Sequence, residues 1–352
     1  MKHSRYSLFV LILVFASFLA ACTGTGAASS WPGITVTEEN IYSAYNNHVY
    51  SINPTNGSMN WRYPEKSDSK LTFFSNPLVD ENLVIVGDFE QSLHGLNKAT
   101  GSEQWVFNQS SGRWIAGPIF AGDLIIAPNA DKSVYALNNK GLLQWKSETN
   151  GANWAQPSAD ADNVYVSSMD HSVYALRIKD GKKVWSTDLG GSVVYSQILS
   201  EDGVLYLGTL GSDLIAVNSK SGNILWKAKT SGSIWGRVVL NDGTIYTGDQ
   251  SGKISAFSAK NGSVLWSIDA GGPVIGGGAV VGDALVFATE NGSLISVDFS
   301  GKKLWNVTVS GKLYSDVLFT GDNIIGAAIE SDKIMQAFDK DGKEIWGFIP
   351  PK

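Results

Sequence analysis

Cysteine and histidine are scarce in this sequence of 352 residues, which has one cysteine, Cys22, and four histidines. A single cysteine cannot form an intramolecular disulfide, so no such bond can stabilise the fold. The motifs His-Glu-x-x-His, Gly-x-Ser-x-Gly and Cys-x-x-Cys are absent. The chain therefore lacks the usual sequence signs of a zinc protease, a serine hydrolase or a dithiol redox protein.

A hydrophobic run long enough to cross a bilayer as a helix is also missing. The apolar run from Leu8 to Ala21 is shorter than the ~20 residues that such a helix needs. It follows Lys2 and Arg5, and a short apolar run after a positive start is typical of a secretory signal. Residues 1–21 are therefore predicted to be a signal peptide.

The end of this run, Leu19-Ala20-Ala21-Cys22, resembles the lipobox of bacterial lipoproteins. The resemblance implies that Cys22 is lipidated and becomes the new N-terminus, and several acyl chains anchor a protein stably. Residues 22–30 have the composition of a flexible tether. We expect the protein to be exported and held on a membrane of the cell envelope, the outer membrane if the organism has one and otherwise the outer face of the plasma membrane. The alternative is an ordinary cleavable signal that leaves Cys22 in the linker.

Basic residues are fewer than acidic ones. Removal of residues 1–21 takes Lys2 and Arg5 from the 27 basic residues, which leaves 25 against 33 acidic ones, a formal net charge of −8. A surface of this sign repels the phosphates of nucleic acids and anionic lipid headgroups. Nucleic acid is therefore not an expected partner.

An internal repeat dominates the rest of the chain. The motif Gly-x-x-x-Trp occurs eight times, and successive tryptophans lie 39 to 44 residues apart. These residues are Trp61, Trp105, Trp145, Trp185, Trp226, Trp266, Trp305 and Trp346. Copies at one period along the whole chain indicate a repeat protein in which each unit covers the next.

Each repeat has the pattern of four short strands. In residues 152–187, runs of about five residues alternate with turns rich in Asp, Asn and Gly, which is typical of an antiparallel meander. The sequence therefore predicts an all-β fold, an eight-bladed β-propeller of four-stranded antiparallel blades over residues 31–350. We expect each motif glycine at positive φ, each motif tryptophan packed between blades, and a ring closed by packing of the last blade on the first.

The repeat also resembles a known family. Residues 202–226 and 242–266 are similar to the pyrroloquinoline-quinone (PQQ) type propeller repeat, and the resemblance extends over residues 31–346. Eight such blades behind a lipobox also resemble the BamB-like family of outer-membrane assembly lipoproteins. That resemblance implies docking on envelope proteins. The family's arginine-bearing partner loop corresponds to residues 186–194, which contain no arginine, so no partner-binding residue is carried over.

Quinoprotein dehydrogenases share this repeat and hold PQQ and calcium. The resemblance to them stops at the repeat, because they carry long insertions and adjacent cysteines over the cofactor, whereas the connections here are short. We expect no cofactor, no metal site and no catalytic residue. Residues 160–163, with the composition of a calcium loop, are predicted to form a hairpin turn. His48, His94 and His171 are predicted to lie on the surface or between blades.

Four further tryptophans do not follow the repeat. The units align on the tyrosine of the predicted second strand, or the residue equivalent to it. Eleven residues before that position, or 12 in one unit, seven of the eight units have an aromatic residue. This is where the chain enters the innermost strand. The predicted ring is Trp31, Phe74, Trp114, Trp154, Tyr195, Trp235 and Tyr314, with Ile275 in the remaining unit. Two residues later, on the same strand face, stand Gly33, Asn76, Ala116, Gln156, Gln197, Arg237, Gly277 and Asp316. Turns rich in Asp and Glu are expected to form an acidic rim at the same mouth.

Two interpretations of this ring remain open. In the first, the aromatics fill space where the blades converge. In the second, they form a funnel over Gln156, Gln197, Arg237 and Asp316 that binds a ligand or peptide, since binding sites combine apolar walls with a few placed polar groups. The predicted function is a non-catalytic, lipid-anchored, monomeric propeller that binds envelope proteins or peptides. A ligand or glycan receptor and a PQQ-dependent dehydrogenase are the alternatives.

Overall fold

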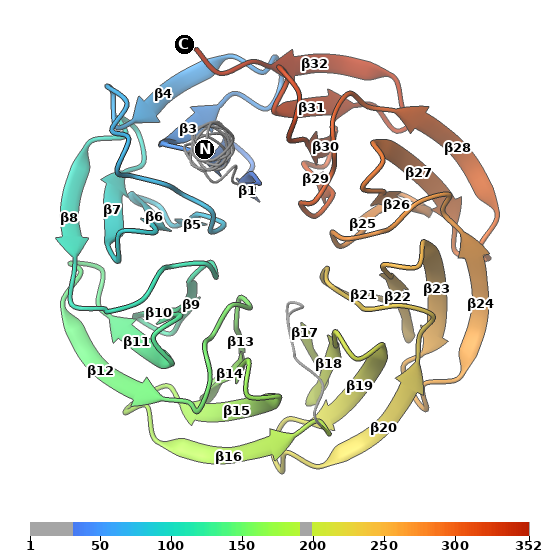
Figure 1. Ribbon diagram of the computed structural model, residues 1–352, viewed down its shortest axis with the longest axis horizontal. Coiled ribbons are helices and arrows are strands. Elements are labelled where there is room, and N and C mark those ends of the chain that lie inside the picture. Colours follow the sequence, from blue (N-terminus) through green and yellow to red (C-terminus); the bar gives the residue numbers. More distant parts are fainter. Residues whose placement is uncertain (1–30, 191–198, 352) are drawn as a thin grey trace, which may run out of the picture.

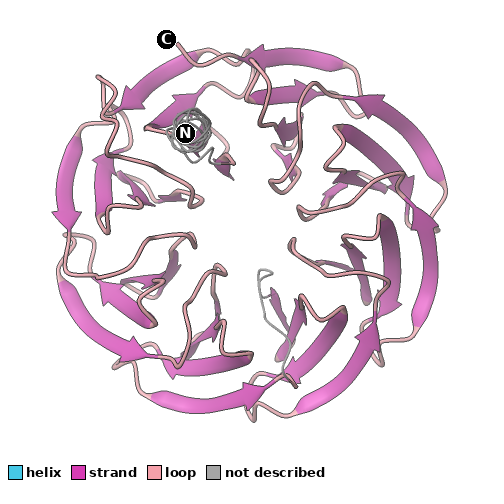
Figure 2. Ribbon diagram, in the orientation of Figure 1, coloured by secondary structure: helices cyan, strands magenta, loops and turns pink. Residues whose placement is uncertain are grey.

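The computed structural model describes residues 31–190 and 199–351, which form a closed ring of four-stranded antiparallel sheets around a central channel (Figure 1). Within these residues there are 32 strands in eight sheets, so the predicted eight-bladed propeller is confirmed. Figure 2 shows only strands and loops there, and no helix of this part is long and apolar enough to cross a membrane. The predicted signal peptide, Cys22, Tyr195 and Gln197 lie outside the described residues.

The strands follow the chain from the channel to the rim in every blade. Blades 1 to 4 consist of β1 (Gly33–Val36), β2 (Ile41–Tyr45), β3 (His48–Ile52) and β4 (Met59–Tyr63); β5 (Leu78–Val79), β6 (Leu83–Gly87), β7 (Leu93–Asn97) and β8 (Glu103–Phe107); β9 (Ile119–Ala121), β10 (Leu124–Pro128), β11 (Ser133–Leu137) and β12 (Leu143–Glu148); β13 (Ser158–Ala159), β14 (Asn163–Ser167), β15 (Ser172–Arg177) and β16 (Lys183–Asp188). Blades 5 to 8 consist of β17 (Leu199–Glu201), β18 (Val204–Gly208), β19 (Asp213–Asn218) and β20 (Ile224–Lys229); β21 (Val239–Asn241), β22 (Thr244–Gly248), β23 (Lys253–Ser258) and β24 (Val264–Asp269); β25 (Ala279–Val281), β26 (Ala284–Ala288), β27 (Ser293–Asp298) and β28 (Lys303–Thr308); β29 (Leu318–Phe319), β30 (Ile324–Ala327), β31 (Met335–Phe338) and β32 (Glu344–Phe348).

The two middle strands of each blade supply the core. In blade 4, β14 and β15 are buried at consecutive positions, whereas β16 alternates between exposed and half-buried residues. Middle strands are covered on both faces by neighbouring blades, so they consist of consecutive apolar residues, as strands buried on both faces do. Hydrophobic clusters accordingly form between adjacent blades, such as the cluster of Tyr165, Ala175, Leu205 and Val217.

The repeat tryptophans connect each blade to the next. Each indole N–H donates to a carbonyl oxygen in the last turn of the following blade at 2.8–3.0 Å, as in Trp61 to Lys98 and Trp145 to Ile178. The predicted packing of these tryptophans between blades is therefore confirmed.

The glycine of each motif contacts the tryptophan of the preceding blade. All eight glycines have φ between 68° and 89°, as predicted, and a Cβ added to any of them would lie within 2.5–3.0 Å of an indole ring. For example, an added Cβ at Gly101 would meet Trp61 at 2.5 Å. Both the backbone conformation and the space under the indole therefore require glycine.

The ring closes between blade 8 and blade 1, where no loop joins the sheets (Figure 1). The Trp346 indole donates to the Pro54 carbonyl at 2.9 Å and covers Gly57. Ile34 and Ile52 of blade 1 share a hydrophobic cluster with residues of blade 8. Each sheet is continuous in sequence, so closure is non-covalent, as predicted.

A charged cluster with a buried pair, Asp88 and His94, and an exposed member, Glu103, lies between blades 1 and 2. His94 Nε2 is 2.9 Å from Asp88 Oδ2, and His94 Nδ1 is 3.0 Å from Glu103 Oε2. The Tyr63 hydroxyl, from blade 1, also donates to Glu103. Of the two environments predicted for His94, the surface or between blades, the structure shows the second, and each ring nitrogen faces a different carboxylate.

Candidate functional site

The loops that lead into the innermost strands are held rigidly at one mouth of the channel. In blades 2, 3, 4, 6, 7 and 8, where the structure describes this position, one residue of the loop is buried between blades, with exposed fractions of 0–1%: Phe73, Trp114, Asn153, Ile234, Val274 and Leu313. Backbone N–H groups of these residues donate to carbonyl oxygens of the preceding blade, from Trp114 to Asp88, Ile234 to Thr209 and Val274 to Asp249, each at 3.0 Å, and from Phe73 to Asn46 at 2.8 Å. Each buried residue therefore anchors its loop, and the residue after it faces the channel.

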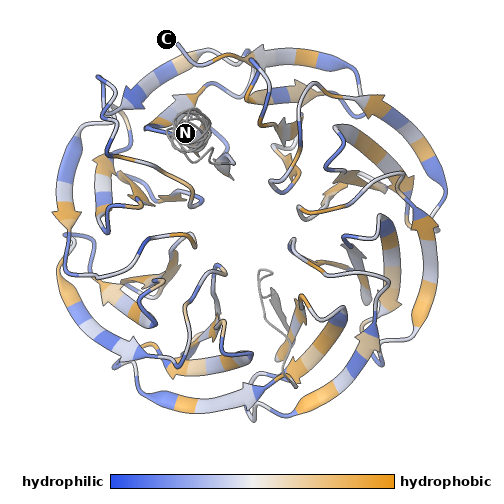
Figure 3. Ribbon diagram, in the orientation of Figure 1, coloured by the Kyte–Doolittle hydropathy of each residue, from blue (hydrophilic) through white to orange (hydrophobic). Residues whose placement is uncertain are grey.

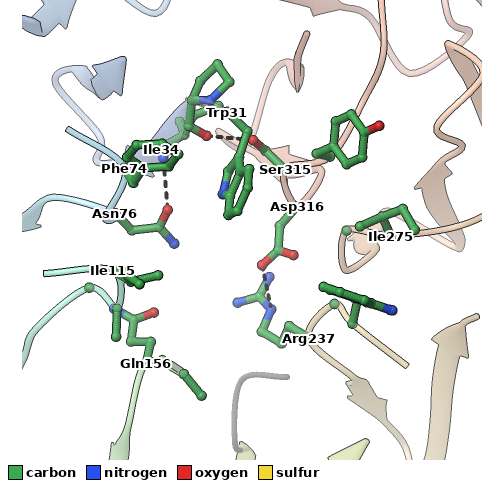
Figure 4. Close-up of a pocket in the computed structure, with 18 of the residues that line it drawn as sticks. Trp31, Ile34, Phe74, Asn76, Ile115, Gln156, Arg237, Ile275, Ser315 and Asp316 are labelled. Carbon is green, nitrogen blue, oxygen red and sulfur yellow. Dashed lines mark hydrogen bonds and ion pairs between the residues drawn. The ribbon is translucent and has the colours of Figure 1, made fainter. Parts of the chain in front are cut away.

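These following residues surround a cavity of about 510 Å³, which we call the mouth cavity (Figure 4). Its walls include one such residue from each of seven blades: Trp31, Phe74, Ile115, Trp154, Trp235, Ile275 and Tyr314. All except Phe74 and the more exposed Trp31 are half-buried. The predicted placement of Trp31, Phe74, Trp154, Trp235 and Tyr314 at one channel mouth agrees with this geometry.

The prediction for Trp114 was wrong. Trp114 is fully buried and packs against Phe107 and Tyr135, with ring centroids 6.4 and 5.5 Å away, and the channel-facing residue of blade 3 is Ile115. The prediction placed Trp114 in the ring only by assuming one extra turn residue. Counting 11 residues back from Ile126, as in the other units, gives Ile115 directly.

One wall of the mouth cavity is a connected set of aromatic contacts. Trp31 meets Phe74 edge to face at 5.3 Å, and Phe74 stacks on Phe89 at 4.1 Å with an interplanar angle of 7°. The Arg113 guanidinium lies over the other ring of this pair, 5.0 Å from the centroid of Phe89. Such stacking holds the ring of Phe74 in place as a wall.

The bottom of the mouth cavity is a layer of planar polar side chains, Asn76, Gln156, Arg237 and Asp316, which we call the floor. Asn76 Oδ1 accepts from the Ile34 N–H at 3.1 Å, and Gln156 Nε2 donates to the Pro118 carbonyl at 3.2 Å. Backbone groups thus orient both amides toward the channel (Figure 4).

Arg237 and Asp316 form the charged half of the floor. Arg237 Nε is 4.0 Å from Asp316 Oδ2, and Asp316 Oδ1 accepts from the Gly277 N–H at 2.5 Å (Figure 4). The two side chains are 35% and 23% exposed, so the pair is in contact with the channel. Opposite charges at this separation leave this part of the floor without net charge.

Glycines between these side chains make room for the floor. A Cβ on Gly117 would lie 3.1 Å from Gln156 Nε2 and 3.2 Å from Asn76 Cβ, and one on Gly277 would lie 2.9 Å from Arg237 Cβ. The corrected register puts Gly117 in the second layer, so the prediction of Ala116 there was also wrong. Glycines in blades 3 and 7 therefore leave space for the larger floor side chains of neighbouring blades.

The channel continues beyond the floor. A second cavity of about 610 Å³ shares all four floor residues and is otherwise lined by innermost strands and their flanking residues, including Val36, Val239 and Val280. The floor is therefore a polar constriction between two cavities.

The predicted acidic rim serves mainly to hold loops. Asp131 Oδ2 accepts from the Ser111 N–H at 3.1 Å, and Asp249 Oδ2 accepts from the Gly232 N–H at 3.2 Å. Glu290 does line the mouth cavity, where Tyr314 donates to it at 2.6 Å. This hydrogen bond, with burial, raises the pKa of Tyr314 to about 12. Residues 160–163 form the predicted hairpin turn, with Asp160 Oδ1 accepting two backbone N–H groups.

The division between anchoring and channel-facing residues predicts that substitutions at two neighbouring positions lower stability by different amounts. Ile234→Ala should lower the free energy of unfolding by about 2–3 kcal/mol, because it leaves a cavity between blades. Trp235→Ala removes more atoms but from a half-buried wall, and should cost less than Ile234→Ala. Denaturant titration of both variants tests this, and a larger loss for Trp235→Ala would mean that the ring mainly packs the fold.

Comparison with known proteins adds the family. A family model described as outer membrane protein assembly factor BamB matches residues 23–153, 130–273 and 250–348. Outer membrane protein assembly factor BamB of Nitrosomonas eutropha is 26% identical over 170 residues, covering 47% of this chain and 41% of the relative. Tetrathionate hydrolase of Acidithiobacillus ferrooxidans is 24% identical over 212 residues, covering 51% of this chain and 42% of the relative.

A solved structure agrees on the fold. The crystal structure of BamB from Moraxella catarrhalis matches with a TM-score of 0.72 and 16% identity, covering 84% of this chain and 92% of that chain. Identity this low shows the fold alone. The chain spans about half the length, or less, of the curated relatives it matches, and these include an enzyme as well as assembly factors.

Proposed function

The chain belongs to the PQQ-type propeller family of outer membrane protein assembly factor BamB, and from this premise we propose that it is a non-catalytic scaffold that binds proteins or peptides during outer-membrane protein assembly. The observation that carries the proposal is the family match, which extends from residue 23 to residue 348 in three overlapping segments. Several curated relatives are assembly factors of this name. Their name supports a place at the cell envelope, where lipidation of Cys22 would hold the protein.

The geometry supports a scaffold in two ways. The blades are locked to each other by the tryptophan contacts, and the strands within each blade are joined by tight turns. A rigid platform of this kind presents one fixed surface to a partner. The enzyme alternative receives less support, because the chain's single cysteine, Cys22, precedes the propeller and cannot supply the adjacent cysteines of quinoprotein dehydrogenases.

One part of the rim is suited to a protein partner. The residue before the repeat tryptophan is apolar and 48–54% exposed in blades 4 to 8, and we call this set the apolar arc: Val184, Leu225, Leu265, Leu304 and Ile345. The same position is polar in blades 1 to 3, where it is Asn60, Gln104 and Gln144. Figure 3 shows hydrophobic residues on the outer strands β20 and β24. Exposed apolar residues that recur along one side of a protein mark a candidate protein interface.

The apolar arc gives a direct test of the scaffold proposal. The full chain should recover a component of the barrel-assembly machinery from an envelope extract of its own organism. The double variant Leu225→Ser, Leu265→Ser should recover at least about tenfold less, because it removes buried apolar contacts at the interface. Quantitative mass spectrometry of the captured proteins measures both.

Val106→Ser is the matched control, because Val106 is 41% exposed on the outer strand of blade 2, outside the apolar arc. This variant should capture the partner as the unmodified chain does. Recovery of no barrel-assembly component by the unmodified chain would refute the proposed function. Equal recovery by all three proteins would refute the apolar arc as the docking surface.

A further inference from the structure

We propose that the mouth cavity is a binding site for a neutral oligosaccharide, held between the aromatic walls and the polar floor. This goes beyond the scaffold function, because the mouth cavity is lined by residues at the innermost strands, whereas the apolar arc lies on the outermost strands β16, β20, β24, β28 and β32, which form the rim in Figure 1. A volume of about 510 Å³ is within the range of about 300–1,000 Å³ that small-ligand sites have.

The walls offer flat aromatic faces to a ligand. Trp31 is 37% exposed, and Trp154, Trp235 and Tyr314 are half-buried around the same cavity. The C–H groups on one face of a sugar ring are apolar and pack against an aromatic ring, while the hydroxyls stay at the edge. Anchoring of the loops by buried neighbours means that these rings are ordered before a ligand binds, which lowers the entropic cost of binding.

The floor offers the hydrogen-bond donors and acceptors that the hydroxyl groups of a sugar need. A sugar hydroxyl both donates and accepts, and neighbouring hydroxyls match planar groups that carry paired donors or acceptors. Amides, a carboxylate and a guanidinium are such groups, and Asn76, Gln156, Asp316 and Arg237 bring them into one layer. The Oδ1 atom of Asn76 faces Ile34, so its side-chain nitrogen is turned toward the channel (Figure 4). The carboxylate of Asp316 is turned toward the channel as well.

The charge of the site disfavours an anionic ligand. Arg237 and Asp316 offset each other at 4.0 Å, and the remaining charged residue of the lining, Glu290, accepts a hydrogen bond from Tyr314. A carboxylate or phosphate would meet two acidic groups and an already paired guanidinium. A peptide that entered the mouth cavity by its C-terminus would bring such a carboxylate. The charges of the lining therefore favour a neutral sugar over the C-terminus of a peptide.

The experiment titrates the full chain in detergent with maltotetraose, cellotetraose and chitotetraose, by calorimetry and intrinsic tryptophan fluorescence. At least one of these neutral probes should release heat and change the fluorescence in the millimolar range or below. Trp154→Ala should weaken that binding at least about tenfold by removing one wall.

Two isosteric variants test the floor without changing its shape. Asp316→Asn keeps the acceptor for the Gly277 N–H, and Asn76→Asp keeps the acceptor for the Ile34 N–H. Each changes the donors and acceptors that face the channel, so each should weaken binding at least about tenfold while the melting temperature stays close to that of the unmodified chain. Asp332→Asn is the matched control, because Asp332 is exposed in blade 8 and does not line the mouth cavity, and it should bind normally.

Several results would overturn the proposal. One is no response to any of the three sugars. Another is binding that survives Trp154→Ala and both floor variants, which would place the sugar elsewhere. A third is a response only to a tetrapeptide or to tetramethylammonium, used as competing probes. Partner capture by the floor variants should stay normal, so failure here is distinguishable from failure of the scaffold proposal.

Discussion

Replacing Trp346 with alanine is expected to lower the free energy of unfolding by about 3–5 kcal/mol, the usual range for a buried tryptophan. Trp346 is 8% exposed, donates to the Pro54 carbonyl and fills the space against Gly57. The variant therefore loses apolar contacts and leaves a cavity between blades 8 and 1. It does so where packing and hydrogen bonds alone hold the ring closed.

Trp145→Ala is the matched control for this seam. Trp145 is 9% exposed, donates to the Ile178 carbonyl at 2.8 Å and packs against Gly181, so the same contacts are lost between blades that the chain itself joins. Both variants should unfold at lower denaturant concentration. Only Trp346→Ala should speed hydrogen exchange selectively in blades 1 and 8, by local opening. Equal exchange patterns would show that the closing seam is no weaker than the others.

Replacing His94 with glutamine is expected to cost about 3 kcal/mol or more, as breaking a buried charged contact usually does. Asp88 is fully buried and His94 is 5% exposed, so Asp88 would lose its ion partner without gaining water. The loss should also weaken contact between blades 1 and 2, because Tyr63 and Phe73 pack against the His94 ring. Chemical denaturation at constant pH measures this effect.

The same residue makes stability depend on pH. Burial opposes protonation of His94, but the hydrogen bonds and charges of Asp88 and Glu103 outweigh this effect and raise the pKa of His94 above its ordinary value of 6.5. A raised pKa in the folded state means that this stabilisation is fully present below pH 6.5 and is lost as pH rises through the folded-state pKa. The denaturation midpoint of the unmodified chain should therefore fall over that range, and that of His94→Gln should not.

His48→Gln is the matched control for the pH experiment. His48 occupies the corresponding strand of blade 1, and burial lowers its pKa, so its contribution has the opposite sign and is lost as pH falls. The His48→Gln variant should retain the fall in stability above pH 6.5. An unchanged pH profile in His94→Gln would show that other groups cause the dependence.

The fold was predictable because its signals are local and repeated. The motif glycines need a positive φ, and the tryptophan after each is the largest apolar side chain available to fill the gap between blades. Eight copies of this motif gave the number of blades, the order of strands and the non-covalent closure. The motif alone did not show that each glycine packs against the tryptophan of the preceding blade, as Gly101 packs against Trp61. That contact joins residues that lie 40 positions apart in the chain.

The candidate site was predictable only in part. The position of Trp154 and Trp235 followed from spacing, but the choice between Trp114 and Ile115 did not, because both residues are apolar and a shift of one residue exchanges the buried and channel-facing sides. The ion cluster of Asp88, His94 and Glu103 gave no sequence signal either, since its members lie on separate strands and turns.

The sequence by itself therefore determined the propeller, because backbone conformation and burial pattern repeat within short segments. Spacing also placed Asn76, Gln156, Arg237 and Asp316 in one layer at the channel mouth, but only the tertiary structure decided which contacts these side chains make. Gly117 and Gly277 make room for Asn76, Gln156 and Arg237, and residues so far apart in the chain as Arg237 and Asp316 become neighbours only when the ring closes.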